Sequence, residues 1–211
     1  MTELPQDPFP ASDFDPWAES YDRDVQTYSD FPFAGYEQVL EKVINLADAR
    51  PGMDVLDLGA GTGNLAVRFA ERGCNLWCTD FSAPMLAKAQ AKLPQAHFVQ
   101  HDLREAWPVE LERRFDCIVS GYVFHHFNLD KKVNLCSKLV AERLALQGKL
   151  IVADLSFPSQ AALNEFKKGI ADWEEEFYWL ADESLEALKA AGLDVVYEQV
   201  SACAGVYFFQ K

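Results

Sequence analysis

The strongest constraint in this sequence is the stretch from Val55 to Leu65, in which an apolar run ends in three alternating glycines. The order of apolar run, tight turn and helical pattern predicts a strand that passes through a loop into a helix. At Gly59, Gly61 and Gly63 the chain is free to take positive φ, and the missing Cβ lets a ligand approach the main chain. The free N–H groups that open the helix then face that ligand. An ordinary glycine-rich turn is the alternative that the stretch alone leaves open.

Size and charge exclude several classes of protein. The 211 residues, 49% of them hydrophobic, suffice for one sizeable core with a modest cap. The formal net charge of −14 opposes binding to a nucleic-acid backbone, which requires a basic surface. We therefore expect a small cationic or neutral substrate and no nucleic-acid partner. Because the N-terminal residues do not form a leader segment and no apolar run is long enough to span a membrane, we expect a cytoplasmic protein without a membrane partner.

The five cysteines are odd in number, stand among apolar residues and form no CxxC pair. This pattern favours buried, reduced thiols over a metal or redox centre. We expect no metal site from the sequence.

The first fifty residues differ in pattern from the rest of the chain. Residues 1–16 are rich in proline and acid and predict a tail or strap. Apolar residues at helical spacing then predict one helix from Trp17 through Tyr28 and a second over 36–49. We therefore divide the chain into a cap (1–50) and a main domain (51–211).

Beyond Gly52 strands and helices alternate, as in a parallel sheet covered on both faces. The predicted strands are 53–58, 75–79, 96–100, 115–120, 149–154, 194–200 and 205–210, and the predicted helices are 64–72, 82–93, one that ends before Gly148, 159–171 and 182–191. Only four residues separate the last two strands, so they predict an antiparallel hairpin. The repeat loosens over 155–181, which we interpret as an insertion. The fold class is therefore α/β, with a Rossmann-like, seven-stranded, mostly parallel sheet.

Polar residues stand at or just after the ends of the first four predicted strands, at the sheet edge where ligands of such folds bind. They are Asp57, Asp80, Asp102 and Ser120. Asp80 stands 21 residues after Gly59, an offset at which a carboxylate reaches a ribose diol in nucleoside-cofactor folds. One strand further along, Asp102 is placed to accept from an adenine amine. The alternatives are a helix-cap or exposed loop residue for Asp80 and a turn residue for Asp102.

Taken together, these motifs resemble those of class I S-adenosylmethionine-dependent methyltransferases. The resemblance covers about Trp17 to Lys211 and rests on residues 57–63, Asp80, residues 101–103 and the run 120–126. The segment 17–22 is similar to the helix that lies over the cofactor in small-molecule members. An antiparallel last strand belongs to that fold as well.

The resemblance implies a cofactor, S-adenosylmethionine, and a set of residues around it. Gly59 and Gly61, with Ala60 between them, lie along the methionine part. Asp80 holds the ribose with Phe81 beside it, Asp102 holds the adenine amine, and Leu103 lies against the ring. Ser120 offers its carbonyl to the ammonium group, and Tyr21 closes the lid. Asp57 supports the glycine loop or contacts a cationic part of the ligand.

Methyl transfer from a sulfonium needs alignment and exclusion of water more than acid–base catalysis. If the acceptor must lose a proton, His125 and His126 are the candidate bases. The alternative is that one hydrogen-bonds the loop and the other packs or is solvated. We expect the acceptor pocket to form from the cap and the 155–181 insertion.

Two features of that insertion are also explained by a purely structural role. Trp173, Phe177 and Leu180 stand at helical spacing, which is more typical of packing against the core. Glu174 to Glu176 would attract a cationic acceptor or form a solvated face.

Two other functions stay open at this point. An adenine-dinucleotide oxidoreductase would bind the same nucleoside, although the glycines here follow G-x-G-x-G rather than G-x-G-x-x-G. A regulatory protein would bind S-adenosylmethionine without turnover. The sequence predicts neither the acceptor nor the oligomeric state.

Overall fold

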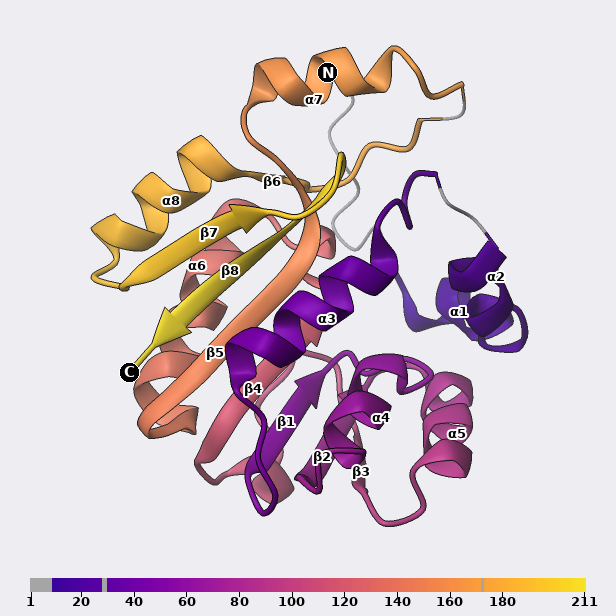
Figure 1. The fold of residues 1–211 in the computed structure, drawn as a ribbon, viewed down its shortest axis with the longest axis vertical. Helices are drawn as coiled ribbons and strands as arrows, with labels where there is room; N and C mark the ends of the chain where they lie inside the picture. Colours follow the sequence, from indigo (N-terminus) through magenta and orange to yellow (C-terminus); the bar gives the residue numbers. More distant parts are fainter. Residues whose placement is uncertain (1–8, 28–29, 172) are drawn as a thin grey trace.

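A computed structural model describes residues 9–27, 30–171 and 173–211. Its sheet has the order β3-β2-β1-β4-β5-β8-β7, and the short strand β6 pairs with β5 (Figure 1). Its strands are β1 (Asp54–Leu58), β2 (Asn75–Asp80), β3 (His97–Gln100), β4 (Phe115–Gly121), β5 (Leu144–Phe157), β6 (Trp179–Leu180), β7 (Val195–Gln199) and β8 (Ala204–Gln210). Neighbouring strands are parallel except β8, which runs antiparallel to both β5 and β7. The predicted mixed sheet and its closing hairpin are confirmed.

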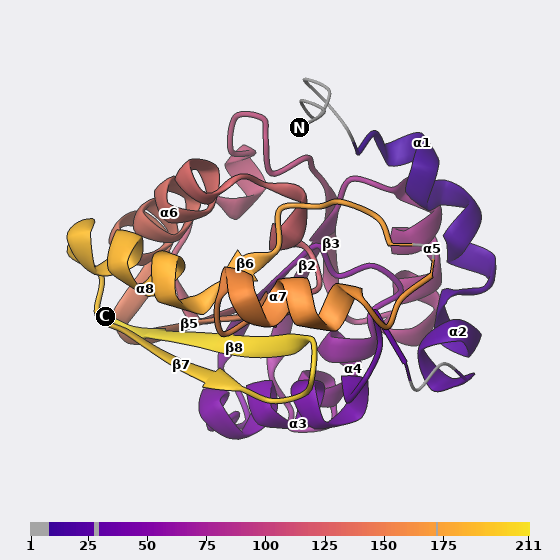
Figure 2. The same ribbon diagram turned by 90° about the horizontal axis from the view of Figure 1, so that it is seen from above.

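Helices cover both faces of the sheet. They are α1 (Ala11–Phe14), α2 (Tyr21–Thr27), α3 (Tyr36–Ala47), α4 (Asn64–Ala70), α5 (Ala83–Lys92), α6 (Leu129–Lys138), α7 (Gln160–Lys167) and α8 (Ala181–Ala190). Short 3-10 turns form η1 (Asp15–Glu19), η2 (Val109–Leu111) and η3 (Phe124–His126), and a π turn forms η4 (Leu139–Arg143). Helices α3 and α4 pack on one face of the sheet and α6 and α8 on the other (Figure 2).

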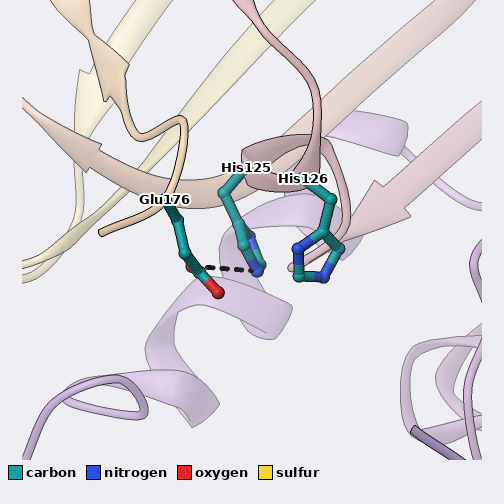
Figure 3. A group of neighbouring side chains, drawn as sticks. All are labelled: His125, His126 and Glu176. Atoms are coloured by element: carbon teal, nitrogen blue, oxygen red, sulfur yellow. Dashed lines mark ion pairs between the residues drawn. The ribbon is translucent and has the colours of Figure 1, made fainter. Parts of the chain in front are cut away.

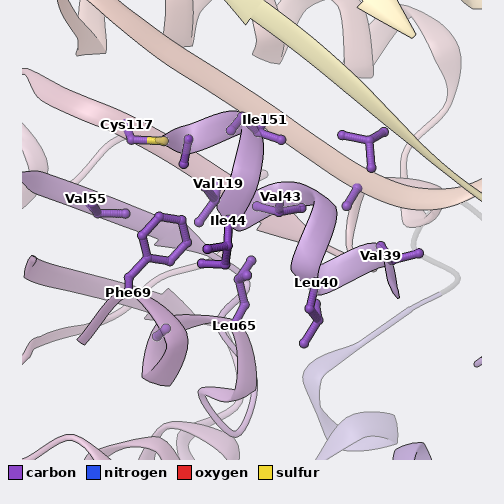
Figure 4. Close-up of a cluster of buried hydrophobic side chains, with 14 of the residues drawn as sticks. Val39, Leu40, Val43, Ile44, Val55, Leu65, Phe69, Cys117, Val119 and Ile151 are labelled. Atoms are coloured by element: carbon purple, nitrogen blue, oxygen red, sulfur yellow. The ribbon is translucent and has the colours of Figure 1, made fainter. Parts of the chain in front are cut away.

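The centre of the sheet is buried because its central strands are largely apolar on both sides. Residues Val55, Leu56 and Leu58 of β1 have no exposed surface. One core cluster fills the face under α3 and α4 (Figure 4). In it, Val43 and Ile44 of α3 pack with Phe69 of α4 and Ile151 of β5. A largely apolar strand that is buried between two helical layers is typical of parallel sheets.

Local signals set several helix ends. The Ser82 hydroxyl accepts a hydrogen bond from the Met85 amide at 3.3 Å and caps α5. Gly73 and Gly192 follow α4 and α8 with positive φ, as the sequence predicts for residues that end a helix.

Three predicted elements differ from the structure. The helix before Gly148 ends at Lys138 and passes through a π turn into β5, so that Leu144 begins a strand rather than lying on a helix face. Strand β5 therefore runs for 14 residues instead of the predicted six. Residues 173–178 are not helical, so the predicted stripe of Trp173, Phe177 and Leu180 does not exist. Instead, Trp173 packs in an aromatic cluster with Phe31 and Tyr178.

The cap also differs in detail from the prediction. Helix α1 and turn η1 occupy residues 11–19, part of which was expected to be a tail, and α2 is separate from η1. Tyr28 lies outside the described residues. Helices α1 and α2 lie beside α5, at the end of the molecule opposite α8 (Figure 2). Among the described residues, no helix is both long and apolar enough to cross a membrane.

The two-sided burial of β1 predicts a large loss of stability when its side chains are shortened. Leu56 has no exposed surface and Leu146 is 88% exposed. We expect Leu56→Ala to lower the free energy of unfolding by about 2–5 kcal/mol, because it removes buried apolar contacts and leaves a cavity. The same change at Leu146 should stay within about 0.5 kcal/mol of wild type. Urea unfolding followed by circular dichroism measures both, and equal losses would contradict the burial described here.

Candidate active site

A cavity of about 710 Å³ opens at the carboxyl ends of β1, β2 and β4. Its walls come from the glycine loop, the cap and the segment after β5. Most of the residues predicted to bind the cofactor line it, namely Tyr21, Asp57, Gly59, Ala60, Gly61, Asp80, Phe81, Asp102 and Leu103. His125 and His126 line it as well. The topology therefore brings nearly the whole predicted site together.

The glycine loop follows β1 and takes positive φ at all three of its glycines. At Gly59 an added Cβ would lie 2.3 Å from a methyl carbon of Val123, so a larger residue is excluded by contact as well as by conformation. At Gly63 the Cβ would lie 3.1 Å from that of Ala89, on α5. At Gly61 it would meet nothing within 4 Å, so the loop backbone there is open to the cavity.

Asp80 fixes this loop from the end of β2. Its buried carboxylate accepts hydrogen bonds from the Gly61 amide at 2.8 Å and from the Ser82 amide at 2.9 Å. Burial raises the pKa of the Asp80 carboxyl, although these amides act in the opposite direction. The side chain thus joins the glycine loop to the start of α5.

Asp57 is the second buried carboxyl of the site. Its Oδ2 has no hydrogen-bond partner. Burial, together with the nearby charge of Asp80, raises the pKa of Asp57 to about 7. The protonation state of this group therefore changes near neutral pH.

Asp102 lies at the adjacent strand end, in contact with Arg104. The Arg104 guanidinium donates hydrogen bonds to both carboxylate oxygens, from Nε to Oδ1 at 2.8 Å and from Nη2 to Oδ2 at 2.5 Å. Burial would raise the pKa of Asp102, but the hydrogen bonds from Arg104 outweigh it and lower the pKa. The same guanidinium lies 5.9 Å from the centre of the Phe81 ring. Asp102 is therefore an ionised, fixed acceptor beside an aromatic wall.

Ser120 is the predicted site residue that the structure places outside the cavity wall. It is fully buried, and its hydroxyl donates to the Leu58 carbonyl at 2.7 Å. Its neighbour Gly121 lines the cavity. The side chain of Ser120 ties β4 to β1.

The cap closes over the loop through polar contacts. Thr62 donates to Asp22 at 2.6 Å, and Ser82 donates to Asp15 at 2.7 Å. Tyr21 hydrogen-bonds Tyr36, a cavity residue of α3. The cap is thus attached to the same loop and helix that Asp80 joins.

Two histidines and a glutamate stand together in the cavity wall (Figure 3). His125 and His126 lie on η3, just after β4, and Glu176 comes from the irregular segment before β6. The Nδ1 atom of His125 lies 2.5 Å from Oδ1 of Asp154, and its Nε2 lies 3.6 Å from Oε2 of Glu176. Burial would lower the pKa of His125, but the two carboxylates outweigh it and raise the pKa.

His126 has a different environment. The rings of Phe9 and Phe14 pack against it, with centroids 4.6 Å and 5.1 Å away. Its Nδ1 has no hydrogen-bond partner, and burial lowers its pKa to about 2. This imidazole is therefore neutral.

Two residues beside this cluster carried no predicted role. Asp154 accepts from the Trp179 indole at 3.0 Å as well as contacting His125. Lys132 is fully buried, donates to the Phe177 carbonyl and lies 4.5 Å from the centre of the Trp179 ring. Burial lowers the pKa of Lys132 to about 7. A signal existed for Asp154, which ends a predicted strand as Asp80 does, but none existed for Lys132.

The unpaired polar atoms of the cavity wall are suited to a polar ligand. Among the described residues, six buried side-chain polar atoms have no partner, and four of them belong to cavity residues, namely Asp57, His101, Tyr122 and His126. Buried polar atoms normally have partners. Unpaired groups gathered around one cavity are therefore expected where a ligand supplies them.

Comparison with known proteins agrees with this geometry. The family described as "Methyltransferase domain" matches residues 55–148. An uncharacterized methyltransferase of Geobacillus thermodenitrificans is 32% identical over 201 residues, with 90% of this chain and 91% of the relative covered. A second one, from Geobacillus kaustophilus, is 33% identical over 202 residues with the same coverage.

Solved structures share the fold. The magnesium protoporphyrin IX methyltransferase of Synechocystis PCC 6803 with bound SAH has a TM-score of 0.73 at 18% identity, covering 95% of this chain and 97% of that one. The DhpI–SAH complex has a TM-score of 0.71 at 20% identity, covering 94% and 93%. These findings favour methyl transfer over the dinucleotide oxidoreductase that the glycines alone left open. Through its relatives and its sheet order, the chain belongs to the class I S-adenosylmethionine-dependent methyltransferases.

Proposed function

We propose that this enzyme transfers a methyl group from S-adenosylmethionine to a small-molecule acceptor held in the same cavity. The main support is that the glycine loop, the cap and the 155–181 insertion line one continuous cavity. The cap contributes Phe14, Trp17 and Tyr21, and the 155–181 insertion contributes Ile170 and Glu176. A cavity of about 710 Å³ is of the size that takes small ligands.

For the cofactor we assign the cavity residues at the glycine end. Asp80 is placed to hold the ribose hydroxyls, and Asp102 to accept from the adenine amine. Phe81 and Leu103 offer the apolar surfaces for the ring. Gly59, Ala60 and Gly61 give the methionine part close access to the main chain.

The remaining cofactor contacts are assigned to Tyr21, Asp57 and the end of β4. Tyr21 belongs to the lid, where its hydrogen bond to Tyr36 anchors it. The unpaired Oδ2 of Asp57 suits a cationic part of the ligand. At the end of β4, Gly121 lines the cavity where Ser120 does not, so the main-chain contact first expected of Ser120 is better supported at Gly121.

The cofactor's sulfonium activates the methyl group, so the protein has to align the acceptor and exclude water. The aromatic residues of the cap and insertion supply an apolar wall for both tasks. We assign His125 and His126 to the acceptor side, where both line the cavity. Glu176 and Glu174 add negative charge there, which favours a cationic or neutral acceptor over an anionic one.

The cellular setting is part of the proposal. The five cysteines are free thiols, four of them buried, which is typical of a reducing compartment. We infer a cytoplasmic enzyme that acts on neither nucleic acid nor membrane.

The proposal is tested with S-adenosylmethionine that carries an isotope-labelled methyl group. The enzyme is incubated separately with the small-molecule and the macromolecular fractions of a bacterial cytosol. Mass spectrometry should find a labelled compound in the small-molecule fraction only, with formation of S-adenosylhomocysteine. Label confined to the macromolecular fraction would refute a small-molecule acceptor.

The ribose assignment predicts a loss of cofactor affinity in Asp80→Asn. A charged hydrogen bond contributes about 1.5–3 kcal/mol, so the Kd for S-adenosylhomocysteine should rise roughly 10- to 100-fold. Asp194→Asn is the matched control, because Asp194 is exposed and lies outside the cavity wall. Calorimetric titration measures both, and an unchanged Kd in Asp80→Asn would remove Asp80 from the binding site.

The pKa of about 7 at Asp57 predicts pH-dependent binding. If the ionised carboxylate faces the cofactor's ammonium, affinity must increase as pH rises and Asp57 loses its proton. Between pH 6 and pH 8 the Kd should fall roughly tenfold in wild type. Asp57→Asn should bind more weakly at pH 8 and show no such change. A pH dependence that persists in this variant would assign it to another group.

A further inference from the structure

The cluster of His125, His126 and Glu176 has the composition of a metal site. One ligand atom of each residue lies within 4.8 Å of those of the other two (Figure 3). All three residues line the cavity. We propose that they bind one divalent transition metal ion of the zinc type, on which the acceptor's heteroatom is held.

The surroundings of His125 support this assignment. A histidine that binds a metal through one ring nitrogen commonly donates from the other to a carboxylate, which fixes the ring. Here Nδ1 of His125 lies 2.5 Å from Asp154, so Nε2 is the atom left to bind. Asp154 is itself held by the Trp179 indole at 3.0 Å and by the Leu155 amide at 2.8 Å. This ring is oriented before any ligand arrives.

The other two ligands are available as well. The Nδ1 atom of His126 is buried and has no partner, an arrangement that costs free energy unless something binds there. The carboxylate of Glu176 lies 3.6 Å from Nε2 of His125, and the adjacent Phe177 amide donates to the His125 carbonyl at 2.9 Å. That hydrogen bond holds the segment of Glu176 against the turn that carries both histidines.

A neighbouring cation would oppose metal binding, and Lys132 is buried close to this cluster. Its ammonium is engaged by the Phe177 carbonyl and by the face of the Trp179 ring. The carboxylates of Asp154 and Glu176 lie in the same region, and their negative charges favour the charged form of Lys132. These two carboxylates therefore offset the ammonium of Lys132, and Arg104, the other cation that acts on His126, is paired with Asp102. The carboxylates favour a proton on His125, and a metal ion would displace that proton when it binds.

Two imidazoles and one carboxylate form a ligand set typical of catalytic zinc, which keeps a fourth position open. Because the three residues line the cavity, that position faces the acceptor space. A hydroxyl or thiol bound there loses its proton more easily, because the metal lowers its pKa. This part rests on the proposed function and narrows the acceptor to compounds with such a group.

The test is metal binding rather than activity. Enzyme freed of metal by a chelator is titrated with ZnCl₂ in a calorimeter, and Co²⁺ is bound in parallel for its absorption spectrum. We expect one Zn²⁺ per chain and a Co²⁺ spectrum of four-coordinate nitrogen and oxygen ligation. Glu176→Gln and His126→Ala should each weaken binding roughly tenfold or more.

Matched controls distinguish the site from surface residues. Glu175→Gln changes the neighbouring exposed glutamate, and His97→Ala changes an exposed histidine that stacks on Trp77. Both should bind Zn²⁺ as wild type does. The absence of stoichiometric Zn²⁺ in wild type, equal binding by Glu176→Gln and Glu175→Gln, or a cobalt–thiolate absorption band would each overturn the proposal. Binding of S-adenosylhomocysteine by the same metal-free protein tests the cofactor site separately.

Discussion

The structure depends on one carboxylate that is shared by two amides. Asp80 accepts from Gly61 in the loop after β1 and from Ser82 at the start of α5. Because both amides would otherwise be unpaired at a buried strand end, these bonds set the shape of the loop. The cap is attached to the same region through Asp15 and Asp22. The cofactor end of the cavity is thus organised before a ligand enters.

Much of this end was predictable from sequence because its signals are local. Glycines that need positive φ, a serine that caps a helix and acids that follow apolar runs each act within a few residues. The mostly parallel sheet followed from the alternation of strands and helices, and the hairpin from its four-residue connection. Asp80 and Asp102 therefore lie in the cavity wall as expected, although the pairing of Asp102 with Arg104 was not anticipated.

The region proposed for the acceptor was less predictable because its contacts join residues far apart in sequence. The spacing of Trp173, Phe177 and Leu180 imitates a helix, whereas the segment is irregular and Trp173 packs against Phe31 and other aromatic residues. The length of β5 was underestimated because its ends are set by pairing with β4, β6 and β8. No local pattern indicates that Lys132 is buried, since its partners come from tertiary packing alone.

The amide of Phe177 connects the insertion after β5 to the turn at His125, and the ammonium of Lys132 connects the same residue to α6. These contacts use a main-chain N–H and C=O of the insertion, which any sequence there except proline provides. The side chains that face the cavity are consequently free to change while the attachment persists. If this segment lines the acceptor space as proposed, changes in its side chains alter acceptor preference and leave the glycine-loop end of the cavity intact.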